Sequence, residues 1–283
     1  MSKKIAAGAN AIVLDVTCGS GAFMPNKEQA KKLASLMSKI GVWANRKTVC
    51  VITNMDEPLG FAVGNTLEVA EAVNALKGKM PDDVKEVVVE LAAQMMYLSG
   101  KYPKLAENRV KVMEVIESGK AFEKFKELVA RQGGDVSYID DPSKFEKAPI
   151  ITPVICEVDG FVEKLDAGKI GKAGLGLGMG RMNKEDSIDP RVGMIFNKKV
   201  GDEVKVGDIL VCKAGDRVAV DGTVIYGSAH VDEAFITGEA LPRKKESGAK
   251  VVVSVGNVVV VVSFVVDFVG LIVAILDVSI TVT

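Results

Sequence analysis

Two glycine-rich segments of this chain have a residue spacing that is typical of phosphate binding. Gly-Ser-Gly at residues 19–21 follows an apolar run at 11–16, and the backbone N–H groups of such a turn can cradle a phosphate. Strand-to-helix turns also need glycine for steric reasons alone, so both interpretations stay open. The run GLGLGMGR at 174–181 invites a dinucleotide-binding interpretation, but no convincing strand precedes it and a polar stretch follows. We expect a glycine-rich β-turn or a tight sheet contact there.

Histidine and cysteine give little support for a metal or redox centre. His230 is the only histidine, which excludes a His-rich metal site. The four cysteines (Cys18, Cys50, Cys156 and Cys212) form no C-x-x-C pair, which argues against a zinc knuckle or a thioredoxin-like motif. We therefore expect free thiols in a reducing cytoplasm.

Composition bounds the class of protein. The 283 residues include 36 Lys and Arg against 37 Asp and Glu, and this balance argues against a nucleic-acid partner. An apolar content of 48% and a charged content of 26% predict a packed core, and the length suggests about two domains. The amino terminus (MSKKIAAGAN) has no apolar segment of useful length, so it does not resemble a secretory signal and we expect a cytoplasmic protein.

The elements that would position these residues begin with an α/β domain over 1–148. Apolar runs at 11–16 and 48–53 predict buried parallel strands, with a helix between them that begins after Asn26, a good N-cap residue. Strand, helix and strand in this order indicate a βαβ unit. Further helices are predicted over 67–76, 105–117 and 121–131. Another is expected from Asp82 or Asp83 to residue 98, with an apolar stripe of Val87, Leu91, Met95 and Leu98. We interpret Met95, Met96 and Met113 as core filler.

A β-rich α+β domain is expected over 149–250, after a proline-containing linker at 140–153. Short β-type runs occur at 154–158, 161–165, 192–196, 209–212, 218–220 and 223–226. The fold class expected for the whole is therefore α/β: a parallel-sheet domain rich in helices, followed by this β-rich domain.

The last part of the chain, 251–283, is rich in valine. Residues 258–276 have the length of a membrane span, but Asp267 lies in the middle and no Lys or Arg follows as an anchor. A buried or aggregating strand suits the valines as well. Membrane association through 258–276 and a non-spanning tail both stay open, with the second favoured.

Three long stretches carry a family resemblance: residues 2–24 (SKKIAAGANAIVLDVTCGSGAFM), 56–78 (DEPLGFAVGNTLEVAEAVNALKG) and 184–208 (KEDSIDPRVGMIFNKKVGDEVKVGD). Together they resemble the pyrimidine-nucleoside phosphorylases, relatives of thymidine phosphorylase, over about residues 1–209. The resemblance implies a pentosyltransferase that cleaves uridine- or thymidine-type nucleosides with phosphate, as a homodimer. It implies a monovalent cation, potassium, and no organic cofactor.

The resemblance also assigns site residues. Lys3 matches a lysine that contacts the pyrimidine; as a plain residue it would be a solubilising terminal charge. Leu59 and Ala62 match backbone carbonyl ligands of the cation, and Glu71 matches its carboxylate ligand, although a solvated helix residue is an equal interpretation of Glu71.

Several departures from the family pattern oppose activity. The chain starts where the family is already well into its sequence, and the family's phosphate-binding glycine loop and most of its dimer-forming helices have no counterpart here. Thr17 and Cys18 stand where the family has a Lys-Thr pair. We assign no catalytic residue and expect this chain alone to be inactive, because an unbound phosphate loses the benefit of proximity.

A second resemblance covers residues 205–245, which are similar to the actuator domain of heavy-metal P-type ATPases. It includes the loop Thr237, Gly238 and Glu239, whose glutamate positions a water for hydrolysis of an aspartyl-phosphate. The phosphorylated DKTGT motif does not occur in the sequence. The alternatives to a phosphorylase are thus a pump actuator fragment and a catalytically inert hybrid. The two resemblances meet in the phrase VGDEVKVGDIL.

Overall fold

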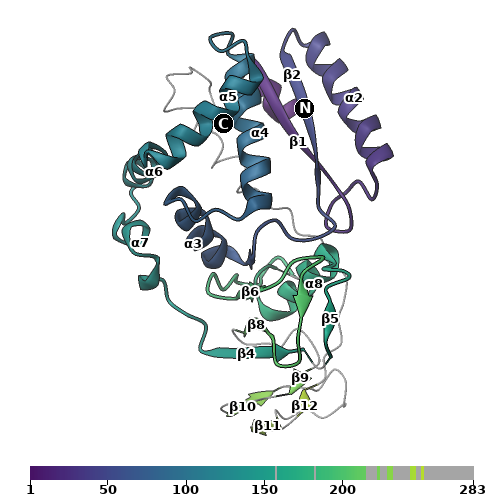
Figure 1. The fold of residues 1–283 in the computed structure, drawn as a ribbon, viewed down its shortest axis with the longest axis vertical. Coiled ribbons are helices and arrows are strands. Elements are labelled where there is room, and N and C mark those ends of the chain that lie inside the picture. The colour runs from purple at the N-terminus through teal and green to yellow at the C-terminus, as the bar shows by residue number, and fades with distance from the viewer. Residues whose placement is uncertain are drawn as a thin grey trace. The chain divides into compact units, whose positions relative to one another are not determined.

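The computed structural model describes residues 1–156, 158–181 and 183–214, together with the strand residues 222–223, 228–231, 243–246 and 250–251. These described residues divide into two compact units (Figure 1). The first contains Met1–Met55 and Glu71–Pro142, and the second contains Asp56–Ala70 and the described residues from Ser143 onward. The domain boundaries expected at 148 and 250 stay predictions.

A parallel β-α-β unit opens the first unit, as predicted. Strands β1 (Ala11–Cys18) and β2 (Lys47–Asn54) pair in parallel from Ala11↔Lys47 to Cys18↔Asn54, and α2 (Lys27–Trp43) connects them. The expected N-cap is present, since the Asn26 side chain accepts a 3.0 Å hydrogen bond from the Gln29 N–H. Figure 1 shows α2 on one face of the strand pair and α4 (Asp82–Leu98) on the other. The α/β fold class is therefore confirmed.

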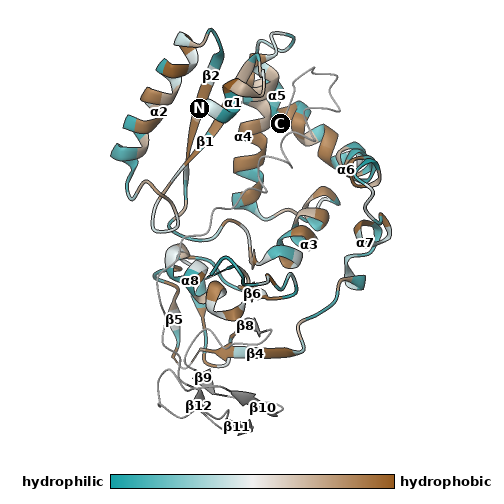
Figure 2. Cartoon of the chain, turned by 180° about the vertical axis from the view of Figure 1, so that it is seen from behind, coloured by the Kyte–Doolittle hydropathy of each residue, from teal (hydrophilic) through white to brown (hydrophobic). Residues whose placement is uncertain are grey.

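Helices form most of the remaining described residues of the first unit. They are α1 (Ser2–Ala6), α3 (Asn65–Leu76), α4, α5 (Leu105–Glu117), α6 (Lys120–Arg131) and α7 (Ser137–Asp140). The division between the units falls within α3, after Ala70. A 3-10 turn, η1 (Pro142–Lys144), belongs partly to the second unit. In Figure 2, β1 and much of α4 are brown, whereas α2 alternates between brown and teal, as a surface helix should.

The buried face of α4 differs from the predicted stripe by about one position. Its buried side chains include Val88, Leu91 and Met96, and it packs against both the strand pair and α5. Because α4 has neighbours on two sides, its buried surface is wider than the stripe of a helix with one buried face. Pro81, rather than Asp82 or Asp83, is the N-cap residue. Met96 is buried, and Met95 and Met113 pack against the same cluster, which confirms that they are core residues.

The second unit contains an antiparallel four-stranded sheet in the order β3-β6-β8-β4. These strands are β3 (Ala62–Val63), β6 (Gly193–Ile195), β8 (Ile209–Ala214) and β4 (Ile150–Ile155). Three two-stranded pairs accompany it: β5 (Gly160–Phe161) with β7 (Glu203–Val204), β9 (Gly222–Thr223) with β12 (Lys250–Val251), and β10 (Ser228–Val231) with β11 (Arg243–Glu246). This part of the chain is β-rich, as expected.

The first half of the glycine run at 174–181 is helical, so the expected β-turn or sheet contact was wrong for residues 174–177. Helix α8 (Ala167–Leu177) begins after Asp166, whose side chain accepts a 3.0 Å hydrogen bond from the Lys169 N–H, and ends at Gly178 with φ 103°. Ala173 and Leu177 pack with Val192 and other residues in a core cluster. These caps and apolar contacts outweigh the low helix propensity of glycine.

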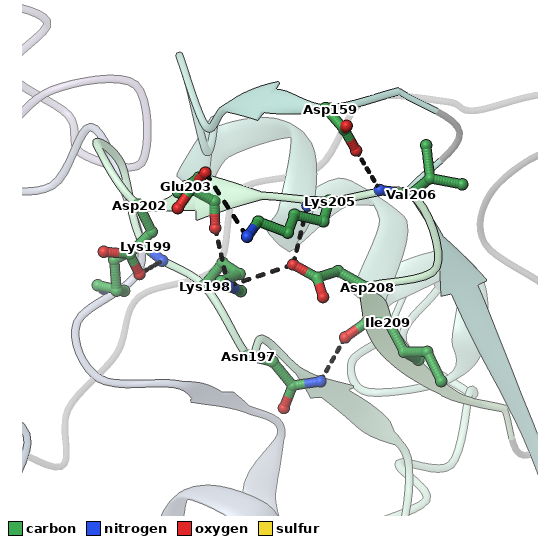
Figure 3. A network of polar contacts seen from close by, with 10 residues as sticks. All are labelled: Asp159, Asn197, Lys198, Lys199, Asp202, Glu203, Lys205, Val206, Asp208 and Ile209. Carbon is green, nitrogen blue, oxygen red and sulfur yellow. Dashed lines mark hydrogen bonds and ion pairs between the residues drawn. The ribbon is translucent and has the colours of Figure 1, made fainter.

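Two copies of the sequence Lys-Val-Gly-Asp form matching turns in the second unit, drawn in Figure 3. In the first, the Lys199 N–H donates to Asp202 Oδ2 (2.8 Å) and the Asp202 N–H donates to the Lys199 carbonyl (3.1 Å). In the second, Lys205 and Asp208 repeat both bonds at 3.1 and 2.9 Å. Both turns contain a glycine at φ 94°. The repeat therefore has a local structural function, which is to hold the backbone on either side of β7.

Most of the valine-rich tail lies outside the described residues, so the membrane interpretation of 258–276 stays a prediction. Among the helices that the structure describes, none combines the length and the apolar composition needed to cross a bilayer.

Candidate functional site

The glycine-rich turn at 19–21 closes the carboxyl ends of β1 and β2. The Gly19 N–H donates to the Met24 carbonyl and the Gly21 N–H to the Met55 carbonyl, both at 2.9 Å. Gly19 has φ 132°, where a side chain would be strained. Because two amides of the turn already bond to the chain itself, the structure favours the steric interpretation of these glycines over a phosphate cradle.

A half-buried carboxyl group lies on the same strand pair. Asp15 on β1 accepts a 2.5 Å hydrogen bond at Oδ1 from the hydroxyl of Thr53 on β2. Burial raises the pKa of Asp15 above its usual value, and the hydrogen bond from Thr53 opposes this shift. Asp15 was not among the residues predicted from the sequence, although a single acid inside the apolar run AIVLDVTC was a signal for it. The carboxyl ends of parallel strands are where α/β folds bind ligands, so Asp15 is a candidate site residue.

Lys3 lies on α1, ahead of β1, and its side chain is exposed. Among the described residues, no hydrogen bond or ion pair joins the Lys3 side chain to Asp15 or to the 19–21 turn. Its assignment to a pyrimidine therefore stays a prediction.

The predicted cation ligands belong to different units: Leu59 and Ala62 to the second, and Glu71, on α3, to the first. Within the second unit the direction of the carbonyl groups can be followed. The Phe196 N–H donates to the Phe61 carbonyl at 2.8 Å, and Ala62 pairs with Ile195. Since carbonyl directions alternate along an antiparallel strand, the Ala62 carbonyl points away from β6, toward the outer edge of the sheet.

A lysine that the sequence analysis did not select lies beside these ligands. The Lys199 ammonium group donates to the carbonyls of Pro58 and of Gly60 (3.0 Å), the residues on either side of Leu59. It also lies 3.7 Å from Glu57 Oε2 and 5.8 Å from the centre of the Phe61 ring. The side chain is only 16% exposed. No sequence pattern predicts this contact, because about 140 residues separate Lys199 from Pro58 and Gly60.

The chemistry of the predicted ligands fits a hard monovalent cation. Two backbone carbonyls and one carboxylate supply only oxygen atoms, which suit potassium better than a transition metal. Among the described residues, no group of three or more His, Cys, Asp or Glu side chains could hold a metal ion. The loop Thr237, Gly238 and Glu239 lies outside the described residues, so its assignment stays a prediction.

Comparison with protein families matches three segments of the chain to three different family models. Residues 1–122 match the glycosyl transferase family a/b domain, and residues 161–212 match the pyrimidine nucleoside phosphorylase C-terminal domain. Residues 195–271 match the P-type ATPase actuator domain. The last two matches overlap at 195–212, where β8 pairs with both β4 and β6. The shared segment is therefore part of the sheet of the second unit.

Curated relatives share the sequence over most of this chain. The pyrimidine-nucleoside phosphorylase of Bacillus subtilis (strain 168) is 49% identical over 224 residues, which are 79% of this chain and 52% of the relative. The one from Geobacillus stearothermophilus is 47% identical over 221 residues, 78% of this chain and 51% of the relative. The Staphylococcus aureus (strain USA300) enzyme is 46% identical over 224 residues, 79% of this chain and 52% of the relative. The chain thus spans about half the length of these relatives.

Proposed function

We propose that this chain, whose residues 1 to about 209 belong to the pyrimidine-nucleoside phosphorylase family, provides the base-binding and cation-binding part of a pentosyltransferase site. The observation that supports this most directly is the 49% identity over 224 residues with the Bacillus subtilis enzyme. The reaction of such a site joins phosphate to C1′ of a pyrimidine nucleoside and releases the base and a pentose 1-phosphate. It requires stabilisation of a cationic sugar and of negative charge on the departing base.

Each proposed residue serves one of these requirements. The Lys3 ammonium group stabilises the anionic pyrimidine as it leaves. Leu59, Ala62 and Glu71 supply oxygen ligands to potassium, which when bound contributes a fixed positive charge. The resemblance provides no counterpart in this sequence for the phosphate-binding loop. We therefore propose that the chain by itself binds a pyrimidine nucleoside without cleaving it.

Two measurements on the 283-residue chain test this function. Calorimetric titration with uridine should give saturable binding, and adenosine should bind more weakly. A chromatographic assay with uridine and phosphate should detect no uracil, while the Bacillus subtilis relative serves as the positive control. Absence of uridine binding would overturn the base-binding function, whereas uracil release would overturn only the proposed inactivity.

A second candidate function comes from the actuator match at 195–271. An actuator fragment anchored through the apolar residues 258–276 would associate with membranes, whereas a phosphorylase-type protein would stay in the cytoplasm. Sedimentation with phospholipid vesicles in the absence of detergent separates the two. We expect the chain in the supernatant, and co-sedimentation with the vesicles would favour the pump function.

A further inference from the structure

We propose that Lys199 is a positioning residue for the cation site: its ammonium group fixes residues 57–62, here called the cation loop, so that the Leu59 carbonyl is directed toward a bound monovalent cation. The inference rests on the proposed cation site and adds to it a residue that does not itself bind the cation. Lys199 and the cation loop both belong to the second unit.

The carbonyl groups on either side of Leu59 both point toward Lys199. Lys199 binds the carbonyl oxygens of Pro58 and Gly60, which immediately precede and follow that of Leu59. Gly60 has φ 72°, which is typical of the third residue of a type II turn, where the preceding peptide group is flipped relative to its neighbours. With both neighbouring carbonyls held by one ammonium group, the Leu59 carbonyl is directed away from Lys199. The positive charge of Lys199 is thereby kept on the side opposite the proposed cation ligand.

Several polar contacts hold Lys199 against the cation loop. Lys199 is largely buried, and a buried ammonium group is costly unless its hydrogen bonds are satisfied, so it holds its partners closely. Glu57 pairs with Lys199 at 3.7 Å and accepts a 3.3 Å hydrogen bond from the Val200 N–H. The turn that carries Lys199 is itself fixed by Asp202 (Figure 3). The Lys199 side chain and the Val200 backbone N–H thus both bind the cation loop.

Lys198 provides a matched control in the neighbouring position. Its ammonium group donates to the Glu203 carbonyl (2.8 Å) and pairs with Asp208 (3.2 Å), and these bonds stay within the 198–208 segment. Replacement of Lys198 removes the same charge from the same turn without removing a bond to the cation loop.

The test measures the melting temperature of the 283-residue chain in KCl, NaCl and choline chloride of equal ionic strength. The variants are Lys199→Met, Lys199→Arg and Lys198→Met. We expect the wild-type melting temperature to rise with KCl more than with choline chloride, in a saturable manner. Lys199→Met should require at least about tenfold more KCl for the same rise, or lose it, whereas Lys198→Met should respond as the wild type does. Arginine can still donate to two carbonyls, so Lys199→Arg should restore part of the response.

The outcomes separate this inference from the function on which it rests. A wild-type chain with no potassium-specific response would overturn the cation site, and the role of Lys199 with it. A wild-type response that Lys199→Met retains would overturn the role of Lys199 alone. If circular dichroism shows that Lys199→Met does not fold, Glu57→Gln is measured instead, because it removes the charge partner of Lys199 and keeps an oxygen acceptor. An unchanged potassium response in Glu57→Gln would then contradict the proposal.

Discussion

Thr53 and Asp15 join the two parallel strands through a 2.5 Å hydrogen bond from the Thr53 hydroxyl to the Asp15 carboxyl group. Asp15 lies on the same strand face as Val13, which packs against the cluster around α4. The bond therefore places a titratable group against an apolar layer, and burial raises its pKa.

This raised pKa predicts a pH dependence of stability. Because the pKa of Asp15 is higher in the folded chain than in the unfolded chain, the folded chain binds more protons between the two values. The free energy of unfolding should therefore fall as the pH rises from about 4 through this interval. Asp15→Asn, which has no charge, should lack that decline when urea unfolding is measured from pH 4 to 7. Thr53→Val, which removes the hydrogen bond that opposes the shift, should make the decline steeper. Equal slopes in all three proteins would contradict the prediction.

Gly41, on α2, lies close to Thr48 on β2. A Cβ atom built at Gly41 would lie 2.0 Å from Thr48 Oγ1 and 2.7 Å from Thr48 Cβ, so Gly41→Ala requires the helix or the strand to move. We expect it to lower the free energy of unfolding by about 1–3 kcal/mol, as overpacking does. Gly176→Ala in α8 is the control. A Cβ there meets no atom within 4 Å, and the change should raise stability by about 0.5–1 kcal/mol. Both variants are measured by chemical denaturation. If both substitutions changed the free energy of unfolding in the same direction, α2 and β2 would be packed less closely than the structure shows.

Asn108 is a polar residue buried between helices, with an exposed fraction of 1%. Its Nδ2 donates to the carbonyls of Ala93 (3.3 Å) and Tyr102 (3.0 Å), and so connects the end of α4 and the following loop to α5. Asn108→Ala leaves both carbonyls without this donor, and should cost about 1–3 kcal/mol in urea unfolding. Asn74→Ala on the exposed surface of α3 should change stability by less than about 0.5 kcal/mol. A cost at Asn108 no larger than at Asn74 would show that water replaces the lost donor.

Local signals in the sequence predicted much of the fold. The helix expected over 105–117 has those bounds in the structure, and the order of strand, helix and strand at the amino end is correct. In both cases the apolar spacing comes from neighbouring positions of the chain, and Asn26 adds a local capping signal at the amino end. The helix at 167–177 was missed because its four glycines suggested a turn, while packing against Val192, outside the helix, decides its structure.

The candidate site was less predictable because its contacts join distant segments. Lys199 reaches the cation loop across about 140 residues, and no periodic pattern relates the two. Asp15 meets Thr53 only because the parallel register sets Asp15 opposite Val51, so that Thr53 lies diagonally across. The family resemblance supplied Leu59 and Ala62, but the residue beside them became visible only in three dimensions.

Lys3 offers the sharpest test of the proposed base contact, because Lys4 on the same short helix carries the same charge. If the Lys3 ammonium group binds the pyrimidine, Lys3→Ala should weaken uridine binding about ten- to hundredfold, the usual cost of losing a charged hydrogen bond. Lys4→Ala should leave the dissociation constant within about twofold in the same calorimetric titration, since it changes the net charge equally without removing the contact. Equal losses in the two variants would indicate general attraction by the positive amino end, and would remove Lys3 from the site.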